Sequence, residues 1–155
     1  MDDATFIDLC AGNTAAFYRV AVSILRRRQD AEDAVQQAFL KGWSARHRAW
    51  KGCEQAWMTR IVINECRNIQ RYRMRVMPVE VMPETPTEGP DIALRMAVDA
   101  LPENLRLPLL LKYMESMSEK EVAIALRLSV PAVKSRLLRA KRILRNELNE
   151  EVEWP

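Results

Sequence analysis

A proline-rich segment near the middle of this 155-residue chain limits how the chain can fold. Residues 76–90 read VMPVEVMPETPTEGP and contain four of the eight prolines together with three glutamates. Proline lacks a backbone donor and disfavours helix in the residue before it, so this segment is expected to be an extended, flexible linker. At full stretch it would span about 50 Å, roughly the length of 15 base pairs. The segment therefore predicts two small domains, residues 1–75 and residues 91–155.

The residues before the linker follow a helical pattern. Apolar side chains recur there at steps of three and four, which places on one helix face Phe17, Val20, Ala21, Ile24 and Leu25. Asp30 is expected to cap a second helix, and residues 55–72 are expected to form a third. No stretch of useful length alternates apolar and polar residues, as a half-buried strand would. The predicted fold class is therefore all-α.

The residues after the linker predict four more helices, of which the last two are joined by a tight turn. The first covers residues 91–101, and the second, after Pro102, has a buried stripe of Leu105, Leu109, Leu110 and Tyr113. Ser118 and Glu121 have the spacing of a capping box, and Ser129 is expected to cap the last helix. The buried side of that helix is expected to comprise Val133, Leu137, Ala140 and Leu144. This arrangement is a helix-turn-helix, which places its second helix in the major groove of DNA.

Charge is distributed unevenly along the chain, although the net charge is only +3. Residues 26–75 contain twelve basic and five acidic residues, and residues 106–145 contain ten basic and three acidic residues. Residues 76–105 contain one basic and six acidic residues. Two basic modules on either side of an acidic spacer favour two contacts with a polyanion such as DNA. Solvated helix faces, including a helical hairpin with a basic solvent face at the end of the chain, remain the alternatives.

The chain lacks the residue patterns of an enzyme or a metal site. Its one histidine, His47, would need Cys53 and Cys66 beside it to bind a metal, and no glycine-rich phosphate loop or carboxylate pair is present. We therefore expect no enzymatic activity, metal, cofactor or small-molecule substrate. No apolar run is long enough for a membrane span, and the N-terminus lacks a signal-peptide pattern. These features predict a cytoplasmic protein without membrane insertion, in which the three cysteines are free thiols.

Three stretches, residues 30–43, 57–73 and 126–140, carry a resemblance to a known family. The three stretches occur in this order, with a Pro/Glu-rich linker between the last two. Together they resemble those of an extracytoplasmic-function (ECF) sigma factor, the minimal two-domain bacterial transcription initiation factor. The first stretch resembles the helix that binds core RNA polymerase. The second resembles the promoter-melting and minus-ten helix, and the third resembles the minus-thirty-five recognition motif. The resemblance covers nearly the whole chain.

The resemblance implies that the first domain docks on the clamp helices of the large polymerase subunit. Three polar residues match the contacting positions and two apolar residues neighbour them: Asp33, Gln36, Gln37, Phe39 and Leu40. A helix face that mixes polar and apolar side chains suits a specific, separable interface. Gln37 stands where the family more often has an acid. The alternative is that Asp33 serves only the helix dipole and that the glutamines are solvated.

The resemblance also implies a promoter-melting surface on the third helix. The side chains toward the minus-ten element would be Trp57, Arg60, Asn64, Arg67 and Arg71. Melting needs a ring against unstacked bases, an amide that reads a base edge, and cations along the phosphates. Core packing is the alternative for Trp57. The loop at residues 50–57 is shorter than the family pattern, at the place where that pattern shapes a pocket for an extruded base.

In the last helix, the resemblance assigns contacts with the upstream promoter element. The positions that match DNA-facing residues are Lys134, Ser135, Leu138 and Arg139. Arginine or lysine can donate two bonds to a guanine edge, and leucine can touch a thymine methyl. Arg136 and Arg142 are candidates for phosphate contacts or helix packing. Arg127 replaces the glycine that is usual in the turn, and Ala132 replaces a hydroxyl residue that the family often has.

The function expected from this resemblance is that of a transcription initiation factor which directs core RNA polymerase to specific promoters. The expected partners are the clamp helices and flap of the polymerase, promoter DNA and an anti-sigma factor. Two alternatives stay open. One is a freestanding helix-turn-helix regulator, which would usually need dimer symmetry. The other is a sigma-like interaction module without promoter activity.

Overall fold

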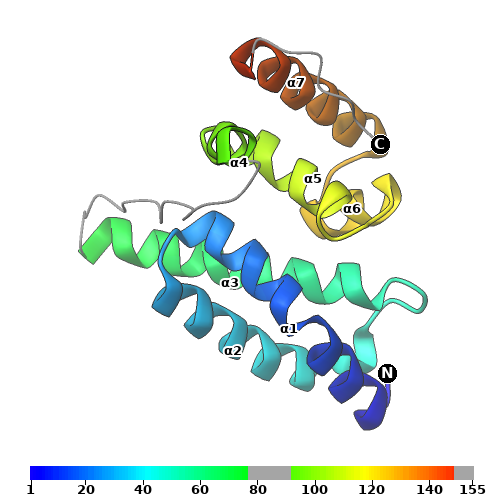
Figure 1. Cartoon of the computed structure of the whole chain (residues 1–155). Helices are drawn as coiled ribbons and strands as arrows, with labels where there is room; N and C mark the ends of the chain where they lie inside the picture. The colour runs from blue at the N-terminus through cyan, green and yellow to red at the C-terminus, as the bar shows by residue number, and fades with distance from the viewer. Residues whose placement is uncertain (77–91, 149–155) are drawn as a thin grey trace.

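The computed structural model describes residues 1–76 and 92–148, and the regular structure in these residues is helical throughout (Figure 1). The helices are α1 (Asp3–Leu25), α2 (Arg28–Ala45), the short 3-10 helix η1 (Arg46–Arg48), α3 (Glu54–Val76), α4 (Ile92–Asp99), α5 (Glu103–Tyr113), α6 (Glu119–Leu126) and α7 (Val130–Leu148). The predicted all-α fold class is confirmed. The linker expected at residues 76–90 lies, except for Val76, outside the described residues.

Helices α1, α2 and α3 pack against one another to form the first half of the molecule (Figure 1). Helix α1 ends at Leu25 and is followed by Arg26, whose φ of 62° is left-handed. Helix α2 begins at Arg28. Asp30 therefore lies inside α2, and the prediction that Asp30 caps this helix is wrong. Its buried carboxylate instead forms an ion pair with Arg73 of α3, with 2.6 Å between Nη2 and Oδ2.

Helices α4 to α7 form the second half, in which α6 and α7 are the helix-turn-helix. The Glu121 amide donates to Ser118 Oγ at 3.1 Å, and the Ser118 amide donates to Glu121 Oε1 at 3.1 Å, which confirms the capping box. In the turn, Arg127 has a φ of 57° and a ψ of 46°, the left-handed conformation that glycine adopts most readily. The Ala132 amide donates to Ser129 Oγ at 3.2 Å, so Ser129 caps α7 as predicted.

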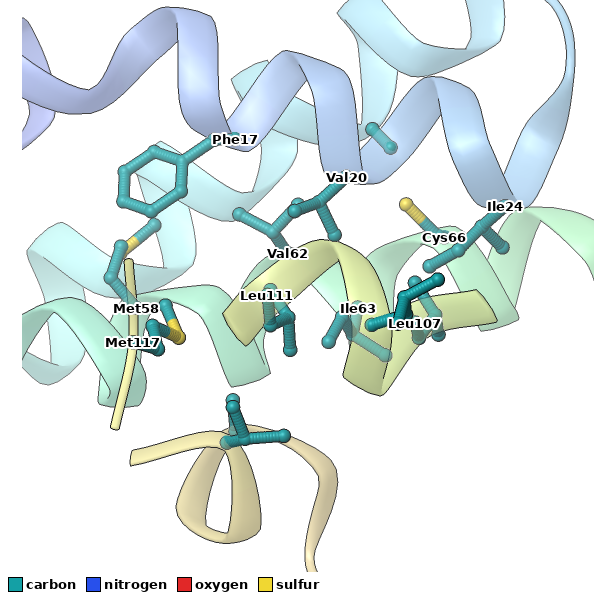
Figure 2. Close-up of a cluster of buried hydrophobic side chains, with 14 of the residues drawn as sticks. Phe17, Val20, Ile24, Met58, Val62, Ile63, Cys66, Leu107, Leu111 and Met117 are labelled. Atoms are coloured by element: carbon teal, nitrogen blue, oxygen red, sulfur yellow. The ribbon is translucent and has the colours of Figure 1, made fainter. Parts of the chain in front are cut away.

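The two halves share one hydrophobic core, because α5 and α6 pack on α1 and α3. Figure 2 shows side chains of both halves meeting in this core, among them Val20, Ile24, Met58, Val62, Ile63, Leu107, Leu111 and Met117. Of the stripe predicted for α5, Leu105 and Leu109 are buried but Leu110 and Tyr113 are only half-buried. Leu107 and Leu111, 1% and 0% exposed, were not part of that stripe. Helix α5 is therefore buried on more than one side, since it also packs against the first half.

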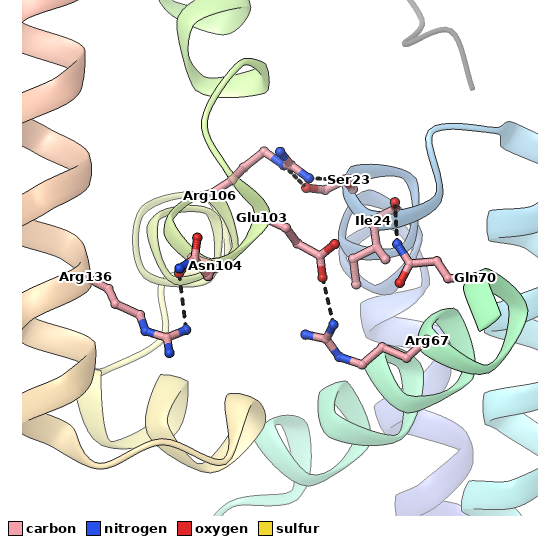
Figure 3. A network of polar contacts seen from close by, with 8 residues as sticks. All are labelled: Ser23, Ile24, Arg67, Gln70, Glu103, Asn104, Arg106 and Arg136. Carbon is pink, nitrogen blue, oxygen red and sulfur yellow. Dashed lines mark hydrogen bonds and ion pairs between the residues drawn. The ribbon is translucent and has the colours of Figure 1, made fainter. Parts of the chain in front are cut away.

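A buried arginine adds polar contacts between the halves (Figure 3). Arg106 of α5 is 5% exposed. Its Nε donates to Ser23 Oγ at 2.9 Å, and its Nη2 donates to the Ser23 carbonyl at 2.7 Å. Its Nη1 donates to the Leu101 carbonyl at 2.6 Å. Burial lowers the pKa of Arg106 to about 10, so the guanidinium is charged at neutral pH and fastens α5 to the end of α1.

Candidate nucleic-acid and protein-binding surfaces

The outward face of α7 carries most of the residues predicted to read the upstream element. The inward face of this helix is buried as predicted, through Val133, Leu137, Ala140 and Leu144. Burial of that stripe leaves the other side of the helix in solvent, and the exposed residues there include Lys134, Ser135, Leu138, Arg139 and Arg142. Leu138 is 55% exposed, so this face offers both cations and an apolar side chain, as contact with base edges requires.

Two residues of α7 are held by neighbouring helices. Arg136 is half-buried, and its Nη1 donates to the carbonyl of Asn104 at 3.4 Å, so it packs toward α5 and lies away from the outward face (Figure 3). Lys134 Nζ lies 3.8 Å from Glu119 Oε2, and Lys112 Nζ donates to Glu119 Oε1 at 2.8 Å. The hydrogen bond from Lys112 lowers the pKa of the Glu119 carboxyl. Glu119, which was not among the predicted site residues, thus holds a negative charge beside Lys134.

The predicted DNA contacts of α3 differ in exposure, unlike those on the outward face of α7. Asn64, Arg67 and Arg71 are exposed. Arg67 Nη1 donates to Glu103 Oε1 of α5 at 3.0 Å (Figure 3), and Arg71 donates to Asn68 Oδ1 of its own helix. Two of the three exposed side chains are therefore already hydrogen-bonded within the molecule, and Arg67 is bonded across the boundary between the halves.

Trp57 is not presented to solvent, contrary to the predicted melting surface. Its side chain is 7% exposed and belongs to the shared core, where its neighbours in α3, Ala56 and Met58, are also buried. Trp57 packs in the core in this structure, as the alternative interpretation expected. An exposed ring beside α3 belongs instead to Trp50, which is 43% exposed. The sequence signal that could have found Trp50 is its position two residues before Gly52, because glycine is typical of surface turns. In the structure Gly52 has a φ of 82°.

Arg60 supports the Trp50 ring from α3. Its guanidinium carbon lies 4.9 Å from the ring centroid, within the range of a cation–π contact. The side chain is half-buried, and burial, followed by the nearby charge of Arg127, lowers the pKa of Arg60. The structure therefore pairs a predicted cation, Arg60, with a ring that the sequence analysis did not select, Trp50.

The exposed face of α2 matches four of the five residues predicted to bind polymerase. These exposed residues are Asp33, Gln36, Gln37 and Leu40, the last being 64% exposed. Phe39 differs from them, because it is half-buried and its ring meets the ring of Phe17 edge-on, with 6.1 Å between centroids. Phe39 therefore supports this face from beneath. A groove of about 430 Å³ runs between this face and α3 and is lined by Asp30, Asp33, Gln36, Gln37, Ile69, Tyr72 and Arg73.

The described residues contain neither a metal-binding cluster nor a membrane-spanning helix. In the described ranges, 1–76 and 92–148, no group of three or more His, Cys, Asp or Glu side chains is placed to hold a metal ion. The three cysteines are free, and burial raises the pKa of Cys66 to about 12 and that of Cys10 to about 11. No helix within the part of the chain that the structure describes is long and apolar enough to cross a membrane.

Known sequences resemble both halves of the chain. Residues 12–76 match Sigma-70 region 2, and residues 91–144 match Sigma-70, region 4. The RNA polymerase sigma-E factor of Streptomyces coelicolor is 32% identical over 145 residues, which cover 86% of this chain and 80% of that protein. The ECF RNA polymerase sigma factor SigE of Mycolicibacterium smegmatis is 28% identical over 146 residues, which cover 84% of this chain. This chain spans 56% of the length of SigE, so it matches little more than half of that relative.

Solved structures with the same fold extend the likeness to almost the whole chain. One is the sigma factor RpoE in complex with the anti-sigma factor NepR from Bartonella quintana, with a TM-score of 0.77, 22% identity, and coverage of 96% of this chain and 99% of that chain. Another is CnrH in complex with the cytosolic domain of CnrY, with a TM-score of 0.72 and 26% identity. It covers 97% of this chain and 92% of CnrH. Both halves are therefore part of the shared fold.

Proposed function

This chain belongs to the extracytoplasmic-function group of the sigma-70 family, and from that membership we propose that it is a transcription initiation factor which binds core RNA polymerase and directs it to specific promoters. The observation that carries the proposal is the presence on one chain of a basic recognition helix and a separate mixed polar and apolar face on α2. A freestanding regulator needs only the first surface, and an interaction module needs only the second.

We assign the upstream promoter element to the outward face of α7. Lys134 and Arg139 are exposed cations that can each donate to a guanine edge, and Leu138 can contact a thymine methyl. Ser135 and Arg142 lie on the same exposed side and suit phosphate or base-edge contacts. In this assignment Arg136 has a packing role, because it reaches toward α5.

We assign the minus-ten element and strand opening to α3 and the loop that precedes it. Asn64 is an exposed amide that can read a base edge, and Arg67 and Arg71 can follow the phosphates. The stacking surface is assigned to Trp50, because its ring is exposed whereas the ring of Trp57 is in the core. Arg60 holds the Trp50 ring from below.

We further propose that residues 1–75 and residues 91–155, which share one core in this structure, act on DNA as two units joined by residues 76–90, so that one chain contacts two separated promoter elements. The partners are then the clamp helices and flap of core polymerase, and promoter DNA. An anti-sigma factor is a further proposed partner, supported by the presence of one in the complex of the similar RpoE. We place the protein in the cytoplasm with the polymerase, and we assign it no enzymatic activity or cofactor.

Reconstituted transcription tests this proposal. The chain is combined with core RNA polymerase and randomised linear DNA, and the DNA that is bound and transcribed is selected and sequenced. We expect new start sites only when the chain and the polymerase are both present. Specific DNA binding without polymerase and without transcripts would identify a freestanding regulator. Polymerase binding without initiation at any site would identify an interaction module.

The face of α2 has its own test. Asp33→Ala combined with Gln36→Ala should weaken retention of core polymerase in a pulldown, because both side chains are exposed on the proposed docking face. The circular dichroism spectrum and thermal melt should not change, since neither side chain packs in the core. Unchanged polymerase affinity in the folded double variant would move the docking face elsewhere.

A further inference from the structure

The groove between α2 and α3 has walls from two helices that lie far apart in the sequence. These helices run antiparallel, since Asp30 near the start of α2 pairs with Arg73 near the end of α3, and Lys41 near the end of α2 pairs with Glu65. One wall is the α2 face with Asp33, Gln36 and Gln37. The other wall is formed by Ile69 and Tyr72 of α3. Asp33, Gln36 and Gln37, which are already assigned to polymerase binding, therefore line the same groove as Ile69 and Tyr72 of α3.

An ion pair connects the two walls of this groove. Arg73 Nη2 lies 2.7 Å from Asp30 Oδ1 and 2.6 Å from Oδ2, and the Asp30 side chain is 12% exposed. Because each charge neutralises the other, this pair adds no net charge to the groove. Asp33 is exposed and has no ion-pair partner among the described residues, so its carboxylate sets the charge that an occupant meets.

Tyr72 gives the α3 wall a large exposed side chain. It is 59% exposed, whereas Ile69 beside it is half-buried. Residues 57–73 resemble a promoter-melting and minus-ten helix, but Tyr72 is not among the five residues of this stretch predicted to contact DNA. The structure instead places Tyr72 in the lining of a groove that it shares with the polymerase-binding face of α2. Tyrosine is enriched in protein interfaces, where one exposed ring can carry a large part of the binding energy.

We propose that a helix of core polymerase lies in this groove and that Tyr72 and Ile69 of α3 bind it together with the α2 face. The inference rests on the proposed function and adds a second wall to the polymerase interface. The occupant is expected to offer a basic side chain to Asp33 and an apolar side chain to the Tyr72 ring. The groove is continuous with the α2 face, and its single unpaired carboxylate is complementary to a cation.

Promoter DNA is a less suitable occupant of the groove than a polymerase helix. DNA binding depends on neutralisation of phosphates by lysine and arginine. The arginine in this groove, Arg73, is already paired with Asp30, and the unpaired charge is the carboxylate of Asp33. A negative charge there opposes phosphate approach, whereas it favours a basic side chain of a protein partner.

The test compares two neighbouring exposed residues on α3. Tyr72→Ala removes the ring that lines the groove, and Met74→Ala is the matched control, because Met74 is 80% exposed and does not line it. The affinity of each labelled full-length chain for core polymerase is measured without DNA. We expect Tyr72→Ala to weaken binding about tenfold or more and Met74→Ala to change it less than about twofold. Tyr72→Phe keeps the ring and should bind about as well as the unaltered chain.

A second measurement separates this inference from the proposed function. Each variant is assayed for promoter binding at polymerase concentrations that saturate it, and thermal melts establish that it is folded. Equal polymerase affinities for Tyr72→Ala and Met74→Ala would overturn the inference. If Asp33→Ala with Gln36→Ala still weakened binding in that case, the proposed docking on α2 would stand. If the double variant did not weaken binding either, both the inference and the proposed docking on α2 would fail. Normal polymerase affinity of Tyr72→Ala with lost promoter binding would assign the groove to DNA and would also overturn the inference.

Discussion

Helices α3 and α7 are both long, basic and amphipathic, but they differ in what surrounds them. Helix α3, with 23 residues, packs against α1, α2 and α6, so other helices cover much of its surface. Helix α7, with 19 residues, packs against α4, α5 and α6 through one buried stripe and leaves a broad face in solvent. The second half therefore presents its proposed DNA surface freely, whereas part of the α3 surface also holds the two halves together.

The boundary between the halves explains this difference. Leu107 and Leu111 of α5 fill the core beside α1 and α3 (Figure 2). At its rim, Arg19 of α1 forms an ion pair with Glu115 at 2.7 Å, and Arg67 of α3 pairs with Glu103. The second half thus covers the first half with α5 and α6, and α7 lies on the far side of α5 (Figure 1). The comparison can be tested by substitutions on each side of this boundary.

The largest effect is expected for Trp57→Ala. Loss of a ring that is 7% exposed should lower the free energy of unfolding by about 3–5 kcal/mol, measured by urea denaturation followed by circular dichroism. Trp50→Ala is the matched control, because its ring is 43% exposed, and it should change stability by less than about 1 kcal/mol.

These two tryptophan variants also test the stacking assignment. In complexes with core polymerase and promoter DNA, Trp50→Ala should reduce the number of permanganate-reactive thymines, because unstacked bases lose the exposed ring. Normal strand opening by Trp50→Ala would remove its stacking role. Stability of Trp57→Ala equal to that of the unaltered chain would show that the Trp57 ring does not support the core.

A smaller loss of stability is expected for Arg106→Ala. The change leaves the carbonyls of Ser23 and Leu101 without their buried donor, which should cost about 1–3 kcal/mol in the free energy of unfolding. It should also loosen the packing of the halves, seen as a larger radius of gyration in X-ray scattering. Arg95→Ala, at an exposed position of α4, is the control. An unchanged radius of gyration would mean that apolar packing alone keeps the halves together.

Arg139→Ala tests the free face of α7. Its exposed guanidinium is assigned to a base edge, so binding to the upstream element should weaken by about 1–3 kcal/mol and the preference at one base pair should relax. Binding is measured by fluorescence anisotropy on a set of single-base variants, with polymerase affinity as the control. Equal weakening for all sequences would assign Arg139 to a phosphate instead.

The smallest effect is expected for Glu103→Gln, which removes the partner of Arg67. The two side chains are 27% and 45% exposed, so the pair should contribute less than about 1 kcal/mol to stability, and less still at high salt. The freed Arg67 should slightly strengthen DNA binding by the first half. A large loss of stability would show that this ion pair, and not the shared core, is the main link between the halves.

The sequence alone determined the elements that depend on residues close together in the chain. The stripe from Val133 to Leu144 follows the helical period, and Ser118 with Glu121 satisfies the first turn of α6 locally, so the helix-turn-helix could be predicted. The exposed face of α7 followed from the same period, because burial of one side leaves the other in solvent. Most of the α2 face, from Asp33 to Leu40, was predictable through its family resemblance.

Only the tertiary structure decided which surfaces meet across the boundary between the halves. Helix α5 carries leucines on more than one side, so the spacing of its apolar residues does not show that Leu107 and Leu111 lie against the first half. The burial of Trp57 and Arg106, and the groove that joins Tyr72 to the α2 face, likewise depend on helices distant in sequence. A periodic pattern predicts which side of a helix is buried, but it does not show which other helix covers that side. The covering helix is decided by the packing of whole helices, to which many residues contribute small amounts of free energy.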